Sequence, residues 1–180
     1  FYDIKGVADA LLKTIRIYDC DYVRTSDSDA FDEASAFHPG RSAVILKDGK
    51  AIGILGEIHP DVAENYGIEV KVYAAKLNVP EMLKLSEKEV TYKPMPKFPA
   101  TTRDLSLICD DNLPAASIEK AIKKAAGKVL EKVTLFDVYK GKQIEEGKKS
   151  ISYSISMRSH DGTLTDEQAD SVMKKVLKAL

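Results

Sequence analysis

Cysteine and tryptophan are scarce or missing in this chain: among 180 residues it has two cysteines, Cys20 and Cys109, and no tryptophan. Two isolated thiols are too few for a disulfide framework or a thiolate metal site, so we expect buried free thiols and a reducing, cytoplasmic environment. Long apolar runs are also missing. None approaches the roughly 20 residues of a membrane span, and no charged-then-apolar leader opens the chain. The sequence predicts a globular protein without membrane contact or bound metal.

Charged residues make up 31% of the chain, yet the net charge is only −1. The first 90 residues carry 11 basic and 16 acidic side chains, whereas the second 90 carry 16 basic and 12 acidic. The more basic second half is therefore the better candidate for binding a polyanion. Between the halves, Pro94, Pro96 and Pro99 disfavour helix and predict an extended linker. We expect a boundary near residues 88–92, between domains at residues 1–89 and 90–180.

The first domain combines helices with antiparallel strands. Apolar residues recur at helical spacing between Ile4 and Ile15, which predicts an amphipathic opening helix. Asp48-Gly49 separates two apolar runs and predicts a type I′ hairpin. His59-Pro60 then begins a short helix that Gly67 ends, and residues 68–74 alternate as a further strand.

Chemistry in this domain would have to come from His38, Arg41, Glu57 and His59. No HExxH pair, glycine-rich phosphate loop or GxSxG elbow accompanies them, so we expect no catalytic site and no metal site. We interpret HPG and GEIHP as turns in which the histidines form local hydrogen bonds. A contact with a partner subunit remains open for His38 and Arg41.

The second domain follows the order strand, helix, strand, strand, helix. The predicted strands are residues 103–109, 132–139 and 150–158. One helix ends near Gly127, and Thr165 with Gln168 forms a capping box for the other. Two helices on one face of an antiparallel sheet indicate a ferredoxin-like layout, so the whole chain is classed as α+β. That layout expects one more strand after the last helix.

Side-chain parity predicts a polar sheet face opposite the helices. From Ser150 to Arg158, polar and apolar residues alternate, as in a strand with one buried face. On the preceding strand we place Phe136 and Val138 under the helices. The predicted open face is then Leu135, Asp137, Tyr139, Ser150, Ser152, Ser154 and Arg158.

This face has the chemistry that reads single-stranded RNA, in which a base stacks on an aromatic ring while polar groups bond its edge. Tyr139 would stack, Asp137 would accept hydrogen bonds from a guanine edge, and Ser150 would bond a base or backbone oxygen. Lys148 and Lys149, with Lys140 and Lys142, would attract phosphates. The plainer alternatives are an amphipathic edge tyrosine, a turn-capping aspartate, a solvated serine row and solubilising lysines. For Arg103 we expect a structural salt bridge or a linker contact.

Several segments resemble a known family. FYDIKG, FHPGRSAVILKDGKAIGILGEIHP and VYAAKLNVPEML are similar to the end of the catalytic-like domain of the bacterial phenylalanyl-tRNA synthetase β subunit. KFPATTRDLSLI, LFDVYKG, GKKSISYSISMRS and TLTDEQ are similar to its C-terminal ferredoxin-fold anticodon-binding domain. The order and spacing match over nearly the whole chain.

The resemblance implies that the first domain is part of a degenerate, non-catalytic class II synthetase fold that packs against a catalytic α subunit, in an assembly of two α and two β subunits. It implies that the second domain contacts the anticodon of the phenylalanine tRNA, through Asp137, Tyr139 and Ser150, and lacks its last strand. ATP and Mg²⁺ belong to the complete enzyme, and no cofactor is expected in this segment. The full set of expected RNA-binding residues is Asp137, Tyr139, Ser150, Ser152, Arg158, Lys148 and Lys149.

Two other functions remain open. A ferredoxin-like regulatory module would bind a small ligand or pair with itself, although a self-pairing face should be more apolar than this one. A scaffolding module would support subunit assembly without touching RNA, and its tRNA affinity would barely depend on salt.

Overall fold

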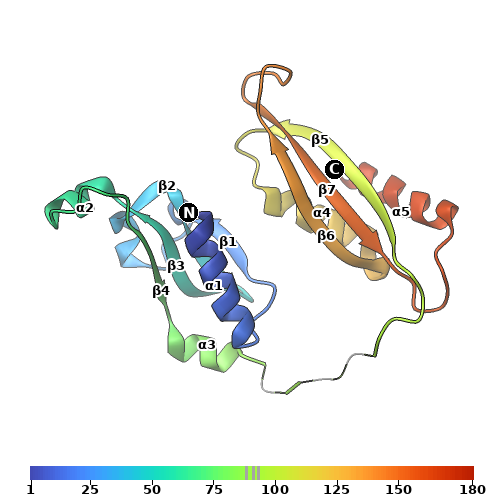
Figure 1. Ribbon diagram of the computed structural model, residues 1–180, viewed down its shortest axis with the longest axis horizontal. Coiled ribbons are helices and arrows are strands. Elements are labelled where there is room, and N and C mark those ends of the chain that lie inside the picture. Colours follow the sequence, from blue (N-terminus) through green and yellow to red (C-terminus); the bar gives the residue numbers. More distant parts are fainter. Residues whose placement is uncertain (88, 91, 93) are drawn as a thin grey trace. The chain divides into compact units, whose positions relative to one another are not determined.

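The computed structural model describes residues 1–87, 89, 90, 92 and 94–180, and the chain divides into two compact units (Figure 1). The first unit comprises residues 1–92 and the second residues 93–180. Each unit has its own sheet and its own core. Parts of the predicted boundary and linker, namely Lys88, Thr91 and Lys93, fall outside the described residues.

The first unit is built on a four-stranded antiparallel sheet with the order β1-β2-β3-β4. Helix α1 packs against β3 and β4 (Figure 1). The elements are α1 (Tyr2–Thr14), β1 (Asp21–Arg24), β2 (Phe37–Lys47), β3 (Lys50–Ile58), α2 (Pro60–Asn65), β4 (Tyr73–Leu77) and α3 (Val79–Leu85). Two short 3₁₀ segments, Thr25–Asp27 and Asp32–Ala36, connect β1 to β2.

The hairpin between β2 and β3 confirms the sequence prediction. Asp48 and Gly49 have φ angles of 50° and 78°, which a type I′ turn requires. The strand predicted at residues 68–74 is wrong for most of its length, because β4 begins only at Tyr73. That residue pairs with Glu57 near the end of β3, so the residues before it have little strand left to pair with. The HPG turn is also corrected, since these residues belong to an irregular stretch of β2 between Phe37 and Ser42.

Both faces of this sheet are covered. Ile54 and Leu55 are neighbours on β3, so their side chains point to opposite faces, and both are fully buried. Leu55 packs in a cluster with Leu12 of α1 and Met82 of α3. Ile54 packs with Phe37 in a second cluster on the other face. The first sheet therefore has two apolar layers.

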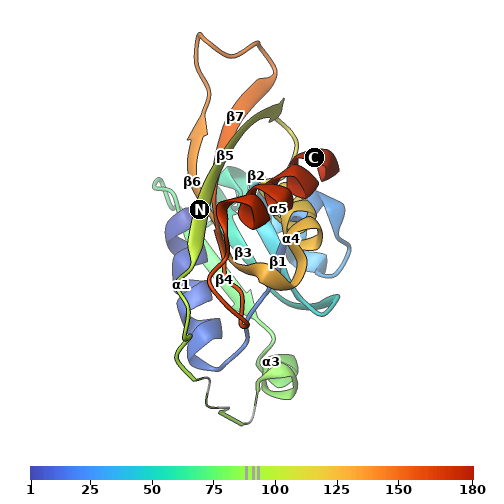
Figure 2. The ribbon, with the colours of Figure 1, turned by 90° about the vertical axis from the view of Figure 1, so that its right-hand side faces the viewer.

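The second unit has a three-stranded antiparallel sheet with the order β5-β7-β6, and α4 and α5 lie together on one side of it (Figures 1 and 2). Its elements are β5 (Thr101–Asp110), α4 (Ala115–Ala126), a 3₁₀ turn (Gly127–Val129), β6 (Leu130–Tyr139), β7 (Lys148–Met157) and α5 (Asp166–Ala179). This arrangement confirms the ferredoxin-like layout and the α+β class. The predicted capping box is also confirmed, with Thr165 and Gln168 bonding each other's backbone amides at the start of α5.

The core of the second unit lies between the sheet and its two helices. Every second residue of β7 contributes to it, and Tyr153 is fully buried with its hydroxyl donating to the carbonyl of Ala115 at 3.0 Å. Burial raises the pKa of the Tyr153 hydroxyl. From the helices, Ile122 and Val176 complete the cluster. The opposite face of the sheet has no covering layer in the described part of this unit.

A β-bulge in β6 corrects two of the predicted positions. The register runs from Leu135 opposite Tyr153 directly to Asp137 opposite Ser152, so Phe136 is an extra residue without a partner. Phe136 is 56% exposed and does not lie under the helices, contrary to the prediction. Leu135 is the second error, because it shares the helix side with Tyr153. Strict alternation fails at the point where the bulge inserts its residue.

Candidate nucleic-acid interface

The uncovered face of the second sheet is organised in rows across its three strands. Ile108 of β5, Ser150 of β7 and Tyr139 of β6 are register partners in one row. Ser106, Ser152 and Asp137 form the next row. These six residues are called the open-face rows below. Asp137, Tyr139, Ser150 and Ser152 therefore come together on one face as predicted.

Tyr139 and Asp137 are the exposed functional groups of these rows. Tyr139 is the last residue of β6 and is 43% exposed. Asp137 is exposed as well. Within the described residues, neither the Asp137 carboxylate nor the Tyr139 hydroxyl has a hydrogen-bond partner or ion pair. Both polar groups are thus available to a ligand.

The serines of the two rows are not equivalent. Ser152 is 6% exposed, and its hydroxyl lies 2.8 Å from the hydroxyl of Ser106. This pair satisfies two hydroxyls within the sheet and leaves Ser152 little surface for a ligand. Ser150 is half-buried between Ile108 and Tyr139, and its side chain makes no such bond within the described part of the chain.

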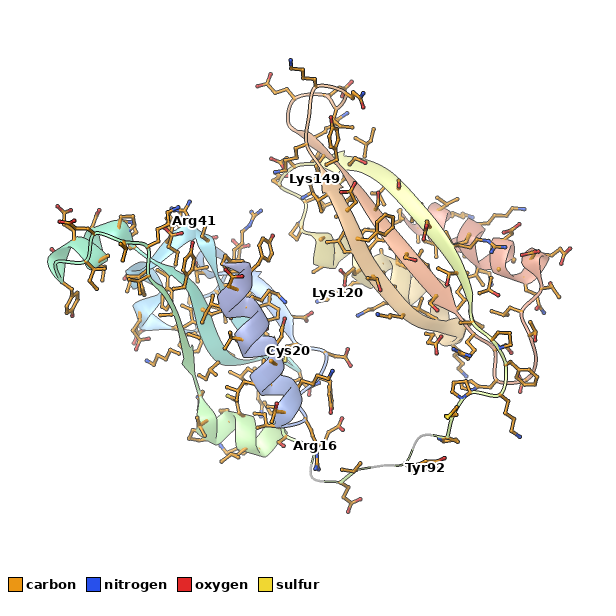
Figure 3. All side chains as sticks on the ribbon, in the orientation of Figure 1. Arg16, Cys20, Arg41, Tyr92, Lys120 and Lys149 are labelled. Atoms are coloured by element: carbon orange, nitrogen blue, oxygen red, sulfur yellow. The ribbon has the colours of Figure 1, made fainter. Side chains whose placement is uncertain are left out.

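The predicted phosphate-binding lysines are held by the protein itself. Lys148 forms an ion pair of 2.6 Å with Glu145, which lowers the pKa of the glutamate and raises that of the lysine. Lys149 lies opposite Cys109 and therefore on the helix side of the sheet. Its ammonium donates to the carbonyl oxygens of Asp111 and Leu113 at 2.8 and 2.7 Å, so it anchors the loop before α4 (Figure 3).

Arg158 also has a structural role. Its guanidinium binds the Glu131 carboxylate through two nitrogens, at 2.9 and 3.1 Å, and donates to the carbonyl of Phe98. These bonds hold the pKa of Glu131 below its ordinary value. Arg103 behaves as predicted, with a salt bridge of 2.6 Å to Asp166 and a longer one of 3.4 Å to Asp170. Both arginines connect the sheet to neighbouring segments.

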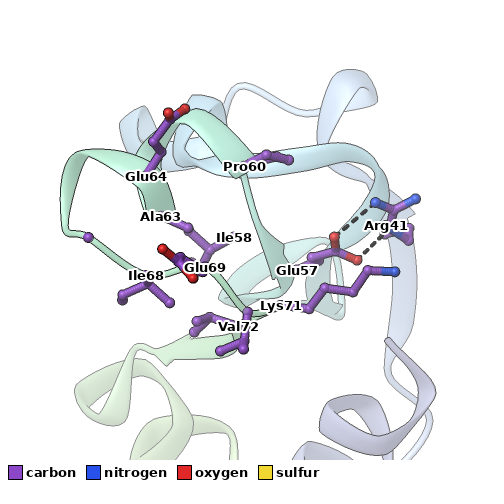
Figure 4. Close-up of a pocket in the computed structure, with 12 residues that line it drawn as sticks. Arg41, Glu57, Ile58, Pro60, Ala63, Glu64, Ile68, Glu69, Lys71 and Val72 are labelled. Carbon is purple, nitrogen blue, oxygen red and sulfur yellow. Dashed lines mark hydrogen bonds and ion pairs between the residues drawn. The ribbon is translucent and has the colours of Figure 1, made fainter.

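The cation predicted as a subunit contact in the first unit is also paired. Arg41 binds the Glu57 carboxylate, whose side chain is only 3% exposed, with one of its hydrogen bonds measuring 2.8 Å (Figure 4). The Tyr73 hydroxyl donates to the same carboxylate at 3.3 Å. The arginine hydrogen bonds lower the pKa of Glu57 although burial acts in the opposite direction.

This ion pair closes one end of a groove of about 570 Å³, lined by α2 and the segment that follows it (Figure 4). The walls are mainly apolar, with Ile58, Ile68 and Val72 among them. The histidines nearby are occupied locally. His38 accepts from the amide of Gly40 at 3.0 Å, and His59 accepts from the amide of Asp61 at 3.3 Å. Local hydrogen bonding was the prediction for both.

Comparison with known proteins matches each unit separately. Residues 96–180 match the model of the ferredoxin-fold anticodon binding domain, and residues 1–79 match that of the phenylalanyl tRNA synthetase beta chain CLM domain. Over its whole length the chain is 43% identical to the phenylalanine–tRNA ligase β subunit of Clostridium tetani, and 40% identical to that of Clostridium acetobutylicum. The chain belongs to the family of phenylalanine–tRNA ligase β subunits. It spans about 22% of the length of these two relatives.

Among the described residues, no group of three or more histidine, cysteine or acidic side chains could hold a metal ion. Cys20 and Cys109 are free thiols. None of the helices in the described ranges is long and apolar enough to cross a membrane.

Sequence reasoning missed two features of this sheet face. Ile108 is 61% exposed and sits across Ser150 from Tyr139, which gives the row an apolar end. Its parity with Ser106 was visible in the sequence and could have placed it there. The bulge at Phe136 had no comparable signal, since neither glycine nor proline marks it.

Proposed function

We propose that the second unit binds the anticodon of the phenylalanine tRNA through its open-face rows. One observation carries this proposal: Tyr139 and the Asp137 carboxylate, which has no partner among the described residues, lie in adjacent rows of the uncovered sheet face. The match to an anticodon-binding domain family supports the same assignment. The site-level placement rests on the register of β6 against β7.

In this proposal, Tyr139 stacks on a splayed anticodon base while Ile108 supplies apolar contact at the other end of the row. Asp137 accepts hydrogen bonds from the N–H groups of a guanine Watson–Crick edge, because an ionised carboxylate only accepts. Ser150, between Ile108 and Tyr139, bonds a base or ribose oxygen. This set suits a guanine, and the resemblance to the synthetase family implies that it is the guanine at the wobble position.

The cations contribute less than the sequence suggested. Lys149 and Arg158 form hydrogen bonds within the protein, and the Ser152 hydroxyl is hydrogen-bonded to that of Ser106. Of the predicted phosphate contacts, Lys148 can leave its exposed glutamate partner at small cost, because surface ion pairs are weak. The face therefore recognises base edges and ring planes more than phosphate charge.

The chain acts by binding and positioning, and bond chemistry with ATP and Mg²⁺ takes place on a partner α subunit in the cytoplasm. Holding the anticodon places the distant acceptor end of the tRNA in the catalytic site, an orientation effect rather than a chemical step. The first unit supports assembly with that subunit. Exposed apolar residues of α1, Val7 and Leu11, favour such a contact, and His38 and Arg41 extend it at the irregular start of β2.

The test is an NMR titration of the 180-residue chain with an anticodon stem-loop of the phenylalanine tRNA. Amides of Asp137, Tyr139 and Ser150 should shift, and the shifts should weaken when the wobble guanine is replaced by adenine. Shifts confined to the first unit, or an equal response to both loops, would contradict anticodon reading by this face. An absence of shifts would favour the scaffolding alternative.

A further inference from the structure

Gly141 lies where a side chain would collide with Tyr139. A Cβ placed on Gly141 would lie 3.1 Å from Cε1 of Tyr139 and closer still to Cζ and the hydroxyl oxygen. Contacts in that range force one of the two groups to move. The tyrosine ring thus extends toward the start of the β6–β7 hairpin, over the space that the glycine leaves empty.

The backbone does not explain this glycine. Five glycines of the described residues have positive φ angles, and Gly141 is not one of them. Gly147, at the other end of the same hairpin, has a φ of 82°, and a Cβ placed on it would have open space around it. The two glycines therefore differ in cause: Gly147 supplies a backbone conformation, whereas Gly141 supplies room.

We propose that Gly141 is a positioning residue for RNA recognition, which sets the orientation of the Tyr139 ring by the absence of its own side chain. This inference rests on the proposed anticodon function of the open-face rows. A base can stack only on a ring held at a suitable angle beside Ser150 and Asp137. With a methyl group at position 141, the ring must rotate into another staggered conformer.

The chemistry of the contact separates a positioning role from a structural one. The atoms that would collide belong to the free end of a half-exposed side chain, so the ring can move without displacing the backbone. Gly141→Ala should therefore leave the melting temperature of the second unit nearly unchanged. Its effect should appear in RNA affinity and in the ring's NMR signals.

The experiment compares Gly141→Ala, Tyr139→Ala and the double variant in the full 180-residue chain, with the anticodon stem-loop as the probe. Gly141→Ala should weaken binding about tenfold, within the range that base–aromatic stacking supplies. In the Tyr139→Ala background it should have no further effect, because the ring it displaces is gone. Gly162→Ala is the matched control, since nothing lies within 4 Å of its Cβ position and its φ is not positive.

Three other results would contradict either the positioning role of Gly141 or the anticodon placement. If Tyr139→Ala weakens binding but Gly141→Ala does not, the positioning role is wrong and the proposed function stands. If Gly141→Ala lowers the melting temperature by several degrees, or weakens binding equally in both backgrounds, the glycine is structural. If Tyr139→Ala leaves affinity unchanged, the anticodon placement itself fails.

Discussion

The two sheets of this chain bury their residues in different patterns. In the first unit, β3 is buried continuously from Ile52 to Glu57, and helices or loops cover both faces. In the second unit, β7 buries every second side chain from Ile151 to Met157 most deeply, and the helices cover one face. A sheet with two covered faces supports a scaffold, whereas a sheet with one free face can present a binding surface.

The same difference between covered and free faces decides whether a carboxylate has a protein partner. Glu57 is on a covered face, where an isolated charge would be costly, and it is bound by Arg41 and Tyr73. Asp137 is exposed on the free face and has no protein partner among the described residues. A carboxylate that the fold leaves unpaired at a water-exposed surface can bind an external donor without first breaking an internal bond.

The largest loss of stability should follow from removing a buried side chain on the covered side of the second sheet. Tyr153→Ala removes a fully buried ring and should destabilise the second unit by about 3–5 kcal/mol in denaturant unfolding. The matched aromatic is Phe136, one strand away but exposed. Phe136→Ala should cost about 0.5 kcal/mol or less. Equal losses for the two variants would contradict the one-sided core.

A smaller loss is expected when the buried carboxylate of the first unit loses its partner. Arg41→Ala leaves the buried Glu57 carboxylate without its cation, with only the Tyr73 hydroxyl bonded to it, and should lower the melting temperature of the first unit by several degrees. Lys76→Ala breaks the exposed pair with Glu33 and should change it little. Amide hydrogen exchange in the first unit would measure the loss of stability in each variant, with the second unit as an internal reference.

The pH dependence of the first unit has a definite sign. Because Arg41 lowers the pKa of Glu57 in the folded state, the pair stabilises the unit at neutral pH, above the unfolded pKa. That stabilisation is lost as the pH falls from about 4.3, the value of a free glutamate, through the lower folded pKa. In Glu57→Gln this part of the acid sensitivity should vanish. An unchanged acid unfolding profile would mean that the pair contributes nothing.

On the free face, we expect a charge-specific loss of RNA affinity. Asp137→Asn removes an ionised acceptor and should weaken stem-loop binding about tenfold, in line with hydrogen bonds to charged groups. Asp104→Asn makes the same change one row further along the open face, on β5, and should have less than about a twofold effect. Fluorescence anisotropy would measure both. Similar effects at the two positions would indicate general electrostatics instead of base reading.

The smallest expected effect is that of salt concentration on the affinity for the stem-loop. Since Lys149 and Arg158 are held within the protein, log Kd should rise with log salt concentration with a slope below about 2, at about 0.7 per phosphate contact in single strands. Lys148→Gln should reduce the slope by about 0.7, one contact. A steep slope would show that phosphate attraction dominates and that the predicted lysines contact the RNA.

The local patterns in the sequence predicted much of this fold. Alternation from Ser150 to Arg158, the Asp48-Gly49 turn and the capping box each depend on neighbouring residues, and each is confirmed. What failed depends on distant partners. The role of Lys149 is set by carbonyl groups 36 and 38 residues away, and no periodicity predicts such bonds. The anticodon placement of Asp137, Tyr139 and Ser150 stays a prediction.

The bulge at Phe136 decides which way the end of β6 faces. If Phe136 paired with Ser152 in a regular ladder, Asp137 would stand opposite Ile151 and Val138 opposite Ser150, which would turn the carboxylate and the tyrosine toward the helices and an apolar side chain toward the ligand. Because the bulge takes up this one residue, deleting Phe136 should keep Asp137 opposite Ser152, so the length of β6 could change by one residue without changing what the open face presents.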